Sequence, residues 1–367
     1  MENFVVSARK YRPSDFATVV GQGHITRTLK NAIATGQLPQ AFLFCGPRGV
    51  GKTTCARILA KTINCEHRTA DNEACNECEN CRSFNEGSSM NIFELDAASN
   101  NSVDDIRELT KQVYIPPQTG RFKVYIIDEV HMLSTSAFNA FLKTLEEPPA
   151  YAKFILATTE KNKIMPTILS RCQVFDFKRI ENRDIVAWLQ HVAEKEGVKY
   201  EQSALELIAV KAQGGMRDAL SIFDQLVNFT QGNLTRAGVM ENLNVLDEEY
   251  YFKMIDFAKS ANVGQALLLY QDVVARGFGG QHFLTGLCEH LRNLLVSLDP
   301  QTLSLIDGSD DLKQRYGRQA QQCSLPLLLG WLNIVGDYEY RFKDANNKNL
   351  FVEICLMKLA STTLPQT

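Results

Sequence analysis

A phosphate-binding loop is the strongest chemical signal in this sequence. Residues 46–53 read Gly-Pro-Arg-Gly-Val-Gly-Lys-Thr, a glycine followed after four residues by glycine, lysine and threonine. The glycines allow backbone N–H groups to close around phosphates at a helix N-terminus, where the helix dipole favours anions. We expect Lys52 to reach the β- and γ-phosphates and the Thr53 hydroxyl to bind Mg²⁺. The predicted nucleotide-binding residues of this loop are Gly46, Pro47, Arg48, Gly49, Val50, Gly51, Lys52, Thr53 and Thr54.

An acidic pair follows a second apolar run, residues 124–127. Asp128 is predicted to hold Mg²⁺, usually through water, and Glu129 to polarise the attacking water as a general base. A kinase rarely needs that glutamate, so the pair predicts ATP hydrolysis. His131 lies close behind and is interpreted as a packing or supporting residue.

Three further polar residues occupy positions where they can act on a nucleotide. Thr159 follows the apolar run 153–157, and ligands of open parallel sheets lie beyond the carboxyl ends of strands. It can therefore face the γ-phosphate and the water, although a threonine there is otherwise unremarkable. Arg171 can reach a neighbour's nucleotide as an arginine finger, and on spacing alone a surface salt bridge fits equally well. Arg217 follows a glycine pair at the start of a helix, so it either senses the γ-phosphate or is an exposed helix arginine.

Four cysteines within a short stretch predict a zinc site. They are Cys65, Cys75, Cys78 and Cys81. Four thiolates suffice for tetrahedral Zn²⁺, and a site with no open position is structural. A reducing cytosol disfavours disulfides, and His67 is an alternative ligand. The six scattered cysteines are interpreted as small buried hydrophobes: Cys45, Cys55, Cys172, Cys288, Cys323 and Cys355.

Alternating strand and helix patterns must position these residues. Short apolar runs at 41–44, 92–95, 123–127, 153–157 and 174–177 predict strands, and residues 55–63 and 136–145 have helical spacing. This alternation predicts an α/β fold with a parallel sheet covered by helices on both faces. From about Arg179 the pattern becomes helical, with further helices predicted around 185–189, 204–209, 266–274, 283–296 and 325–334.

A chain of 367 residues is too long for one ordinary core. We predict an ATP-binding domain at 1–178 with the zinc module at about 64–84. An all-α lid domain at 179–245 and an all-α domain at 246–367 follow it.

The overall composition narrows the class of protein. Hydrophobic residues make up 45% and charged residues 22%, as in a globular protein, and the net charge is −3. Any nucleic-acid contact must therefore come from a local patch. No apolar run is long enough for a membrane span and the N-terminus lacks a signal-peptide pattern, so we expect a cytoplasmic protein without membrane contact.

Taken in order, these motifs resemble those of AAA+ ATPases. The loop, Asp128-Glu129, Thr159, Ser170-Arg171-Cys172 and residues 215–218 are similar to Walker A, Walker B, sensor 1, the arginine finger and sensor 2. The Ser-Arg-Cys form of the finger is typical of clamp loaders. Residues 122–125 and 141–149 resemble the gamma/tau subunit family of bacterial clamp loaders specifically. So does the N-terminal segment with Tyr11, Arg12, Pro13, Val19 and Val20, which in that family lines the adenine pocket. The family also carries a structural zinc module at the position of the four cysteines.

The resemblance implies an ATP-driven machine. Several subunits would form a hetero-oligomeric ring through the last domain, open a sliding clamp and load it onto primed DNA. DNA would be held through phosphates by helix N-termini near residues 100–104, although Ser102 is also explained as a helix cap. Two alternatives remain open: another AAA+ motor that remodels DNA, and a scaffold that binds ATP without hydrolysing it.

Overall fold

The computed structural model describes residues 5–117, 119–243, 246–306 and 310–362. The chain divides into two compact units, residues 1–235 and 236–367, and each is described by itself. The first unit contains both the predicted ATP-binding domain and most of the predicted lid. The division into three domains stays a prediction, and residue 245, at its second boundary, lies outside the described residues.

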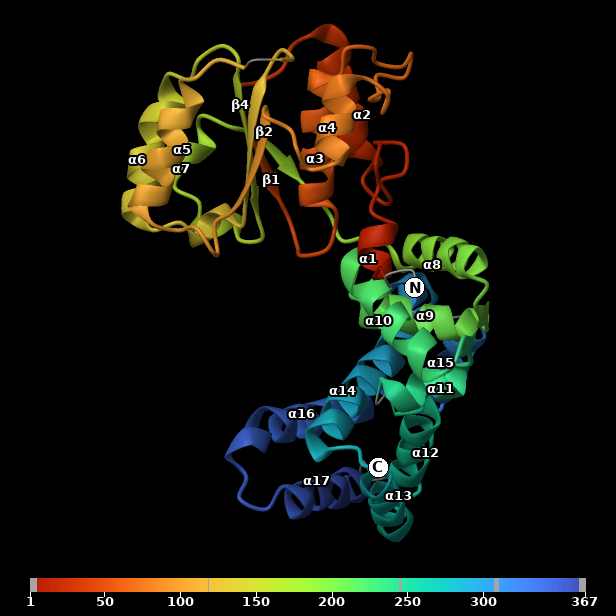
Figure 1. Cartoon of the computed structure of the whole chain (residues 1–367). Helices are drawn as coiled ribbons and strands as arrows, with labels where there is room; N and C mark the ends of the chain where they lie inside the picture. The colour runs from red at the N-terminus through yellow and green to blue at the C-terminus, as the bar shows by residue number, and fades with distance from the viewer. Residues whose placement is uncertain (1–4, 118, 244–245, 307–309, 363–367) are drawn as a thin grey trace. The chain divides into compact units, whose positions relative to one another are not determined.

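A five-stranded parallel sheet forms the centre of the first unit (Figure 1). Its strands are β1 (Ala41–Cys45), β2 (Ile92–Asp96), β3 (Lys123–Asp128), β4 (Ala152–Thr158) and β5 (Gln173–Asp176). They lie in the order β2-β3-β4-β1-β5. All five predicted strands are therefore present, each within two residues of its expected range.

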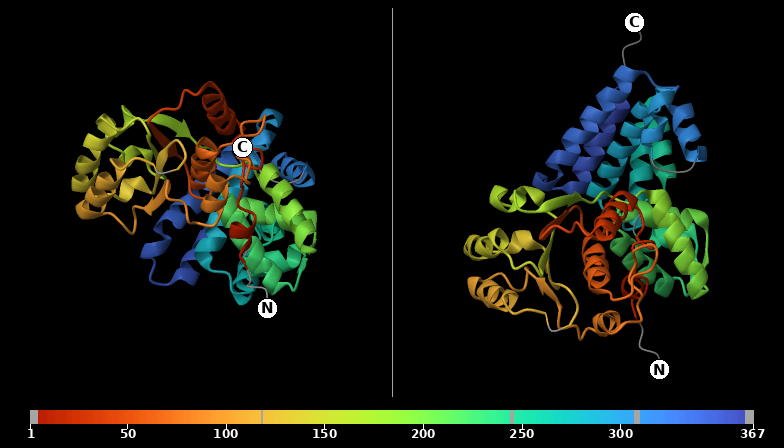
Figure 2. Two further views of the ribbon diagram at one scale, coloured as in Figure 1. Left: turned by 45° about the horizontal axis from the view of Figure 1, so that its top comes forward. Right: turned by 90° about the horizontal axis from the view of Figure 1, so that it is seen from above.

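Each face of the sheet has its own hydrophobic core, because successive strand residues point to opposite faces. Leu43, Tyr125 and Leu156 pack on one face, while Phe42 and Ile155 pack on the other. Figures 1 and 2 show α5 and α6 on the first side and α2 and α3 on the second. The helices of this region are α1 (Ser7–Lys10), α2 (Gly23–Thr35), α3 (Lys52–Asn64), α4 (Glu79–Asn85), α5 (Val103–Val113), α6 (Thr135–Glu146) and α7 (Pro166–Leu169), with the 3₁₀ turns η1 (Val130–Met132) and η2 (Lys161–Lys163).

The rest of the first unit is helical with one exception. Its helices are α8 (Asn182–Glu196), α9 (Gln202–Lys211) and α10 (Met216–Phe229). Two short strands, β6 (Lys199–Tyr200) and β7 (Asn233–Leu234), pair in parallel beside them. The prediction of an all-α lid did not include this pair. Two residues carry too little apolar periodicity to be recognised as a strand.

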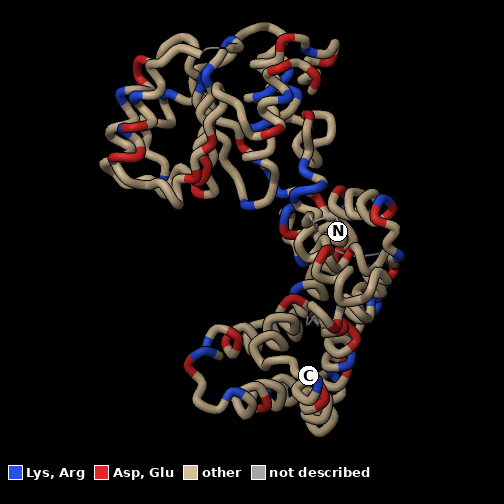
Figure 3. The backbone as a smooth tube through the Cα atoms, in the orientation of Figure 1, with Lys and Arg blue, Asp and Glu red and all other residues tan. Residues whose placement is uncertain are grey.

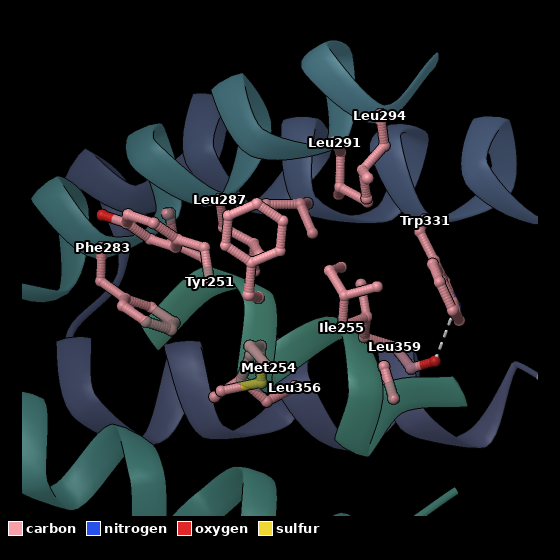
Figure 4. Packing of buried hydrophobic residues seen from close by; sticks show 14 of the residues in the cluster. Tyr251, Met254, Ile255, Phe283, Leu287, Leu291, Leu294, Trp331, Leu356 and Leu359 are labelled. Atoms are coloured by element: carbon pink, nitrogen blue, oxygen red, sulfur yellow. Dashed lines mark hydrogen bonds between the residues drawn. The ribbon is translucent and has the colours of Figure 1, made fainter. Parts of the chain in front are cut away.

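The second unit is built from helices around one core (Figure 4). Its helices are α11 (Arg236–Asn242), α12 (Glu248–Lys259), α13 (Val263–Ala275), α14 (Gly280–Val296), α15 (Asp310–Ala320), α16 (Leu325–Arg341) and α17 (Lys348–Ser361), with the 3₁₀ turns η3 (Pro300–Leu305) and η4 (Phe342–Asp344). Trp331 is fully buried, and its Nε1–H donates to Leu359 O at 3.0 Å. This bond satisfies the one polar atom that the indole brings into the core.

The second unit contains a buried histidine whose titration is expected to make its stability depend on pH. His290 Nε2 lies 3.1 Å from Gln319 Oε1, and Nδ1 lies 3.2 Å from the Tyr316 hydroxyl. Burial lowers the pKa of His290 to about 4, with a further contribution from Arg315, because the charged ring would lose its hydration. Since the unfolded chain then binds the proton first, stability falls as the pH drops from about 6.5 towards 4.

We therefore expect the second unit to lose roughly 1.5 kcal/mol through His290 between pH 6.5 and 5. The chain has two tryptophans, Trp188 and Trp331. In a Trp188→Phe background, urea unfolding followed by Trp331 fluorescence measures this free energy. His290→Gln should remove the acid-dependent loss, while substitution of the exposed His24 should not. Equal pH slopes for the His290→Gln variant and its parent would contradict the assignment.

Basic and acidic residues are interspersed along the backbone of both units (Figure 3). This pattern agrees with the net charge of −3. Within the described part of the chain, no helix combines the length and the apolar character that crossing a membrane requires. Of the six scattered cysteines, Cys172 and Cys288 are half-buried and the other four are buried.

Candidate nucleotide site and cysteine cluster

The phosphate loop connects β1 to α3 as the sequence predicts. Gly46, Gly49 and Gly51 all have positive φ angles, of 150°, 76° and 103°, which only glycine adopts without strain. Lys52 is the first residue of α3, and its buried ammonium donates to Gly46 O and Pro47 O at 2.7 Å each. Burial lowers the pKa of Lys52, and the nearby Glu129 and Asp128 partly offset this effect. The loop therefore surrounds the Lys52 ammonium group, which can contact a phosphate bound there.

Gly46 is the loop position most sensitive to a side chain. A Cβ atom there would lie 2.5 Å from the carbonyl oxygen of Phe177, which is backbone and has no alternative rotamer. We expect Gly46→Ala to displace the loop, to destabilise the first unit by about 2 kcal/mol and to weaken ATP binding at least tenfold. Thermal unfolding and titration with a fluorescent ATP analogue measure both effects. Gly23→Ala, whose Cβ would meet open space, is the matched control.

The donor set for a magnesium ion is already assembled. The Thr53 hydroxyl donates to Asp128 Oδ2 at 2.6 Å, which joins the start of α3 to the end of β3. A hydroxyl and a carboxylate are oxygen ligands of the kind that Mg²⁺ prefers. These two residues therefore fit the ion that the sequence assigned to them.

Glu129 is held in a constrained position beside this pair. Its φ of 48° is left-handed, and its N–H donates to Asp128 Oδ1 at 2.9 Å. Its Oε2 accepts from the Thr159 hydroxyl at 3.0 Å and from the Thr159 N–H at 3.3 Å. His131 is nearly buried, with Nδ1 lying 3.1 Å from the Thr158 hydroxyl and 3.4 Å from Glu129 Oε2. Thr159 and His131 thus orient the carboxylate that the sequence predicted as the base.

A cavity of about 750 Å³ extends from the loop towards the N-terminal segment. Its walls include all five residues that the resemblance assigned to the adenine pocket, namely Tyr11, Arg12, Pro13, Val19 and Val20. They also include residues 48–54, Asp128, Glu129 and Arg217. The structure therefore brings residues 48–54 of the predicted loop, the magnesium residues and the adenine residues to one cavity large enough for a nucleotide. The predicted residues Gly46, Pro47 and Thr159 are not among those that line it.

The start of α10 approaches the phosphate loop closely. The Arg217 N–H points at Gly49 O, 3.4 Å away, and a Cβ on Gly49 would lie 3.3 Å from the Cα of Gly215. Glycine at both positions allows this approach. Arg217 is exposed and lines the cavity, so its guanidinium can reach a ligand there.

Arg171 lies apart from the residues that line this cavity. It is exposed at the end of α7, where its guanidinium donates to Glu146 Oε1 at 2.7 Å and to Thr167 O at 2.8 Å. Its side chain therefore makes a surface ion pair within its own chain. Because Arg171 is exposed, its guanidinium can exchange this ion pair for a contact with a neighbouring molecule.

The four cysteines form one cluster whose geometry fits zinc. Their Sγ atoms all lie within 4.8 Å of one another, and those of Cys65 and Cys75 are 3.5 Å apart. Tetrahedral zinc at a Zn–S distance of 2.3 Å requires about 3.8 Å between sulfurs. Burial opposes ionisation of Cys75, but the N–H groups of Glu77 and Cys78 outweigh it and lower the pKa of this thiol to about 6. Among the described residues, His67 is not part of the cluster.

Several residues of the cavity were missed by the sequence analysis. Asp96 ends β2, Trp188 lies on α8 and Ile180 precedes that helix. Asp96 had a detectable signal, because it is the first polar residue after an apolar strand at the carboxyl edge of the sheet. Trp188 had no such signal, because a tryptophan on an amphipathic helix is normally predicted to lie in the hydrophobic core.

Two family models match consecutive parts of the first unit. A family model described as "DNA polymerase III, delta subunit" matches residues 21–181. A second, described as "DNA polymerase III clamp loader subunit, ATPase lid domain", matches residues 184–232. Among solved structures, the RuvB Holliday junction branch migration motor of Thermotoga maritima has a TM-score of 0.48 at 19% identity, covering 67% of this chain and 78% of that one.

Curated relatives match over most of the sequence. DNA polymerase III subunit gamma of Buchnera aphidicola (Baizongia pistaciae) is 38% identical over 80% of this chain and 79% of its own length. Subunit tau of Bacillus subtilis is 39% identical over 97% of this chain, and that of Escherichia coli 41% over 85%. The chain spans only 63% and 49% of the lengths of those two tau subunits.

The sheet order, the loop after β1, the acidic pair after β3 and the helical lid define an AAA+ ATPase. The similarity to the Buchnera subunit extends over most of both proteins. The chain belongs to the gamma/tau subunit family of bacterial DNA polymerase III.

Proposed function

We propose that this chain hydrolyses ATP to load a sliding clamp onto primed DNA during replication. The observation that carries the proposal is the cavity in which the phosphate loop, the Thr53–Asp128 pair and the oriented Glu129 meet. Family membership supplies the process, because its members are named as DNA polymerase III subunits. The chain is not the polymerising subunit.

Each residue of the proposed nucleotide site has a separate role in ATP hydrolysis. Lys52 and the loop N–H groups hold the phosphates. Thr53 and Asp128 would hold Mg²⁺, which when bound would supply neutralisation of phosphate charge. Glu129 accepts a proton from the attacking water, with Thr159 fixing the orientation of its carboxylate. Arg217 contacts the γ-phosphate from α10, so that the lid responds to hydrolysis.

We assign a structural Zn²⁺ to Cys65, Cys75, Cys78 and Cys81. The supporting observation is the close approach of the four sulfurs. With four protein ligands, the ion has no open position for catalysis.

The proposed partners follow from membership of the gamma/tau family. The second unit assembles the chain with other clamp-loader subunits into a ring in the cytoplasm, where Arg171 reaches the nucleotide of a neighbour. DNA is held through its phosphates near residues 100–104. There Ser102 caps α5, its hydroxyl accepting from the Asp105 N–H at 3.2 Å, which leaves other N–H groups of the first turn for an anion.

The test is the ATPase rate of the chain alone and with clamp, partner subunits and primed DNA. We expect stimulation of at least tenfold only when all components are present, because the finger in trans and the DNA complete the site. High activity of the isolated chain that ignores clamp and DNA would overturn clamp loading and favour another AAA+ motor. Binding of ATP with no hydrolysis under any condition would favour a scaffold.

A further inference from the structure

The loop between the first two cysteines contains a buried glutamate that contacts the N-terminal segment from which part of the cavity wall is built. Glu73 is 8% exposed. Its Oε2 accepts from the backbone N–H of Phe16 at 3.0 Å, and its Oε1 lies 2.8 Å from the ammonium group of Lys30 on α2. Oε2 is thus hydrogen-bonded and Oε1 is in an ion pair without hydrogen-bond geometry, and both partners lie outside the cysteine module.

Phe16 is the central anchor of the N-terminal segment, residues 11–20. This residue is 2% exposed and packs in the same core as Ile25, Leu29 and Ile33 of α2. The segment supplies five cavity residues, three before Phe16 and two after it. A shift of Phe16 would thus move both parts of the wall that faces the base.

The cysteine module is also fixed to the helices on either side. The Arg68 guanidinium donates to Ile33 O at 3.2 Å at the end of α2. The nearly buried Lys61 of α3 donates to Asn76 Oδ1 at 2.5 Å. Within the loop, the Glu73 N–H donates to the Thr69 hydroxyl at 3.1 Å and its carbonyl accepts from the Thr69 N–H at 3.0 Å. Glu73 is therefore presented by a short turn that begins and ends near zinc ligands.

We propose that Glu73 is a positioning residue that couples the zinc-bound cysteine module to the base-binding wall of the nucleotide cavity. Zinc holds the loop closed, the loop presents Glu73, and Glu73 fixes Phe16 and with it the N-terminal segment. By linkage, zinc and nucleotide then strengthen each other's binding by the same factor. The inference rests on the proposed nucleotide and zinc sites and adds a connection between them.

ADP would occupy both the base end and the phosphate end of the cavity, whereas pyrophosphate would occupy only the phosphate end. Comparing the two ligands therefore separates a local effect on the base end from a general loss of folded structure. Fluorescent ADP is titrated into the zinc-loaded protein, and pyrophosphate is measured as a competitor. We expect Glu73→Ala to weaken ADP binding about tenfold, as the loss of a charged hydrogen bond implies, with pyrophosphate affinity unchanged. Glu73→Gln keeps an acceptor for the Phe16 N–H, so its affinity for ADP should lie between those of the wild-type protein and Glu73→Ala. Asp71→Ala, which removes an exposed carboxylate of the same loop, is the matched control.

The reciprocal measurement uses zinc as the reporter. The equilibrium extraction of zinc by a chromogenic chelator is followed with and without saturating ADP. We expect ADP to oppose extraction from the wild-type protein and to lose this effect in Glu73→Ala. If Glu73→Ala fails to fold, Glu73→Gln and the wild-type zinc measurement decide.

The outcomes separate the two proposals. Wild-type affinity for ADP in both Glu73 variants, or zinc extraction that ignores ADP in the wild-type protein, would overturn the coupling and leave the nucleotide site standing. A wild-type protein that binds neither ADP nor pyrophosphate would overturn the nucleotide site and the coupling together.

Discussion

Arg171→Ala is expected to lower the ATPase rate of the assembled complex about a thousandfold and to leave the isolated chain unchanged. The reason is its position. Arg171 is exposed, bound to Glu146 on its own surface and absent from the residues that line its own cavity. A guanidinium so placed stabilises the transition state only in a neighbouring subunit.

Two controls distinguish a finger from a surface ion pair. Arg183→Ala removes another exposed arginine that pairs with a glutamate, Glu181, and should have no effect. Affinity for a fluorescent ATP analogue should be unchanged in Arg171→Ala, because the finger acts on the transition state. A defect of equal size in the isolated chain would show that Arg171 supports its own fold.

Glu129→Gln is expected to reduce single-turnover hydrolysis at least a hundredfold while ATP still binds. The amide keeps the size of the side chain and an oxygen that accepts from Thr159, so the geometry at 3.0 Å is preserved and only the base is lost. Rapid-quench measurement of ADP formation gives the rate, and titration with the fluorescent analogue gives the affinity.

The matched variant is Glu160→Gln, two positions after the buried Thr158. Glu160 also lies near His131, with Oε1 3.3 Å from Nε2, but it pairs with Lys163 at 2.9 Å and is partly exposed. It should retain nearly full activity. Full activity in Glu129→Gln, or loss of activity in both variants, would remove Glu129 from the role of general base.

Much of the first unit follows from local sequence. The loop at 46–53 requires a strand before it and a helix after it, and both are found. The inner strands β1, β3 and β4 are buried and mostly apolar, which is why they were predictable. The edge strands β2 and β5 are less buried and were predicted from shorter apolar signals. The cysteine spacing likewise predicted a cluster that the structure contains. Each of these signals is carried by residues close together in the chain.

Other features depend on contacts between distant residues and had no local signal. Helix α2 was not predicted, although its Lys30 anchors Glu73. The two-residue pair β6 and β7 forms only because residues 199 and 233 meet in space. Trp188 was readable only as helix core, yet it lines the cavity.

The sequence by itself thus determined the types and spacing of the groups that we propose to bind phosphate, to bind metals and to act as a base. Those roles depend on residue type and short spacing, which the chain carries directly. The tertiary structure decided how these groups support one another, because hydrogen bonds such as Phe16 to Glu73 and Thr159 to Glu129 join residues 57 and 30 positions apart. Such contacts depend on how the sheet and helices pack, and no local pattern specifies them.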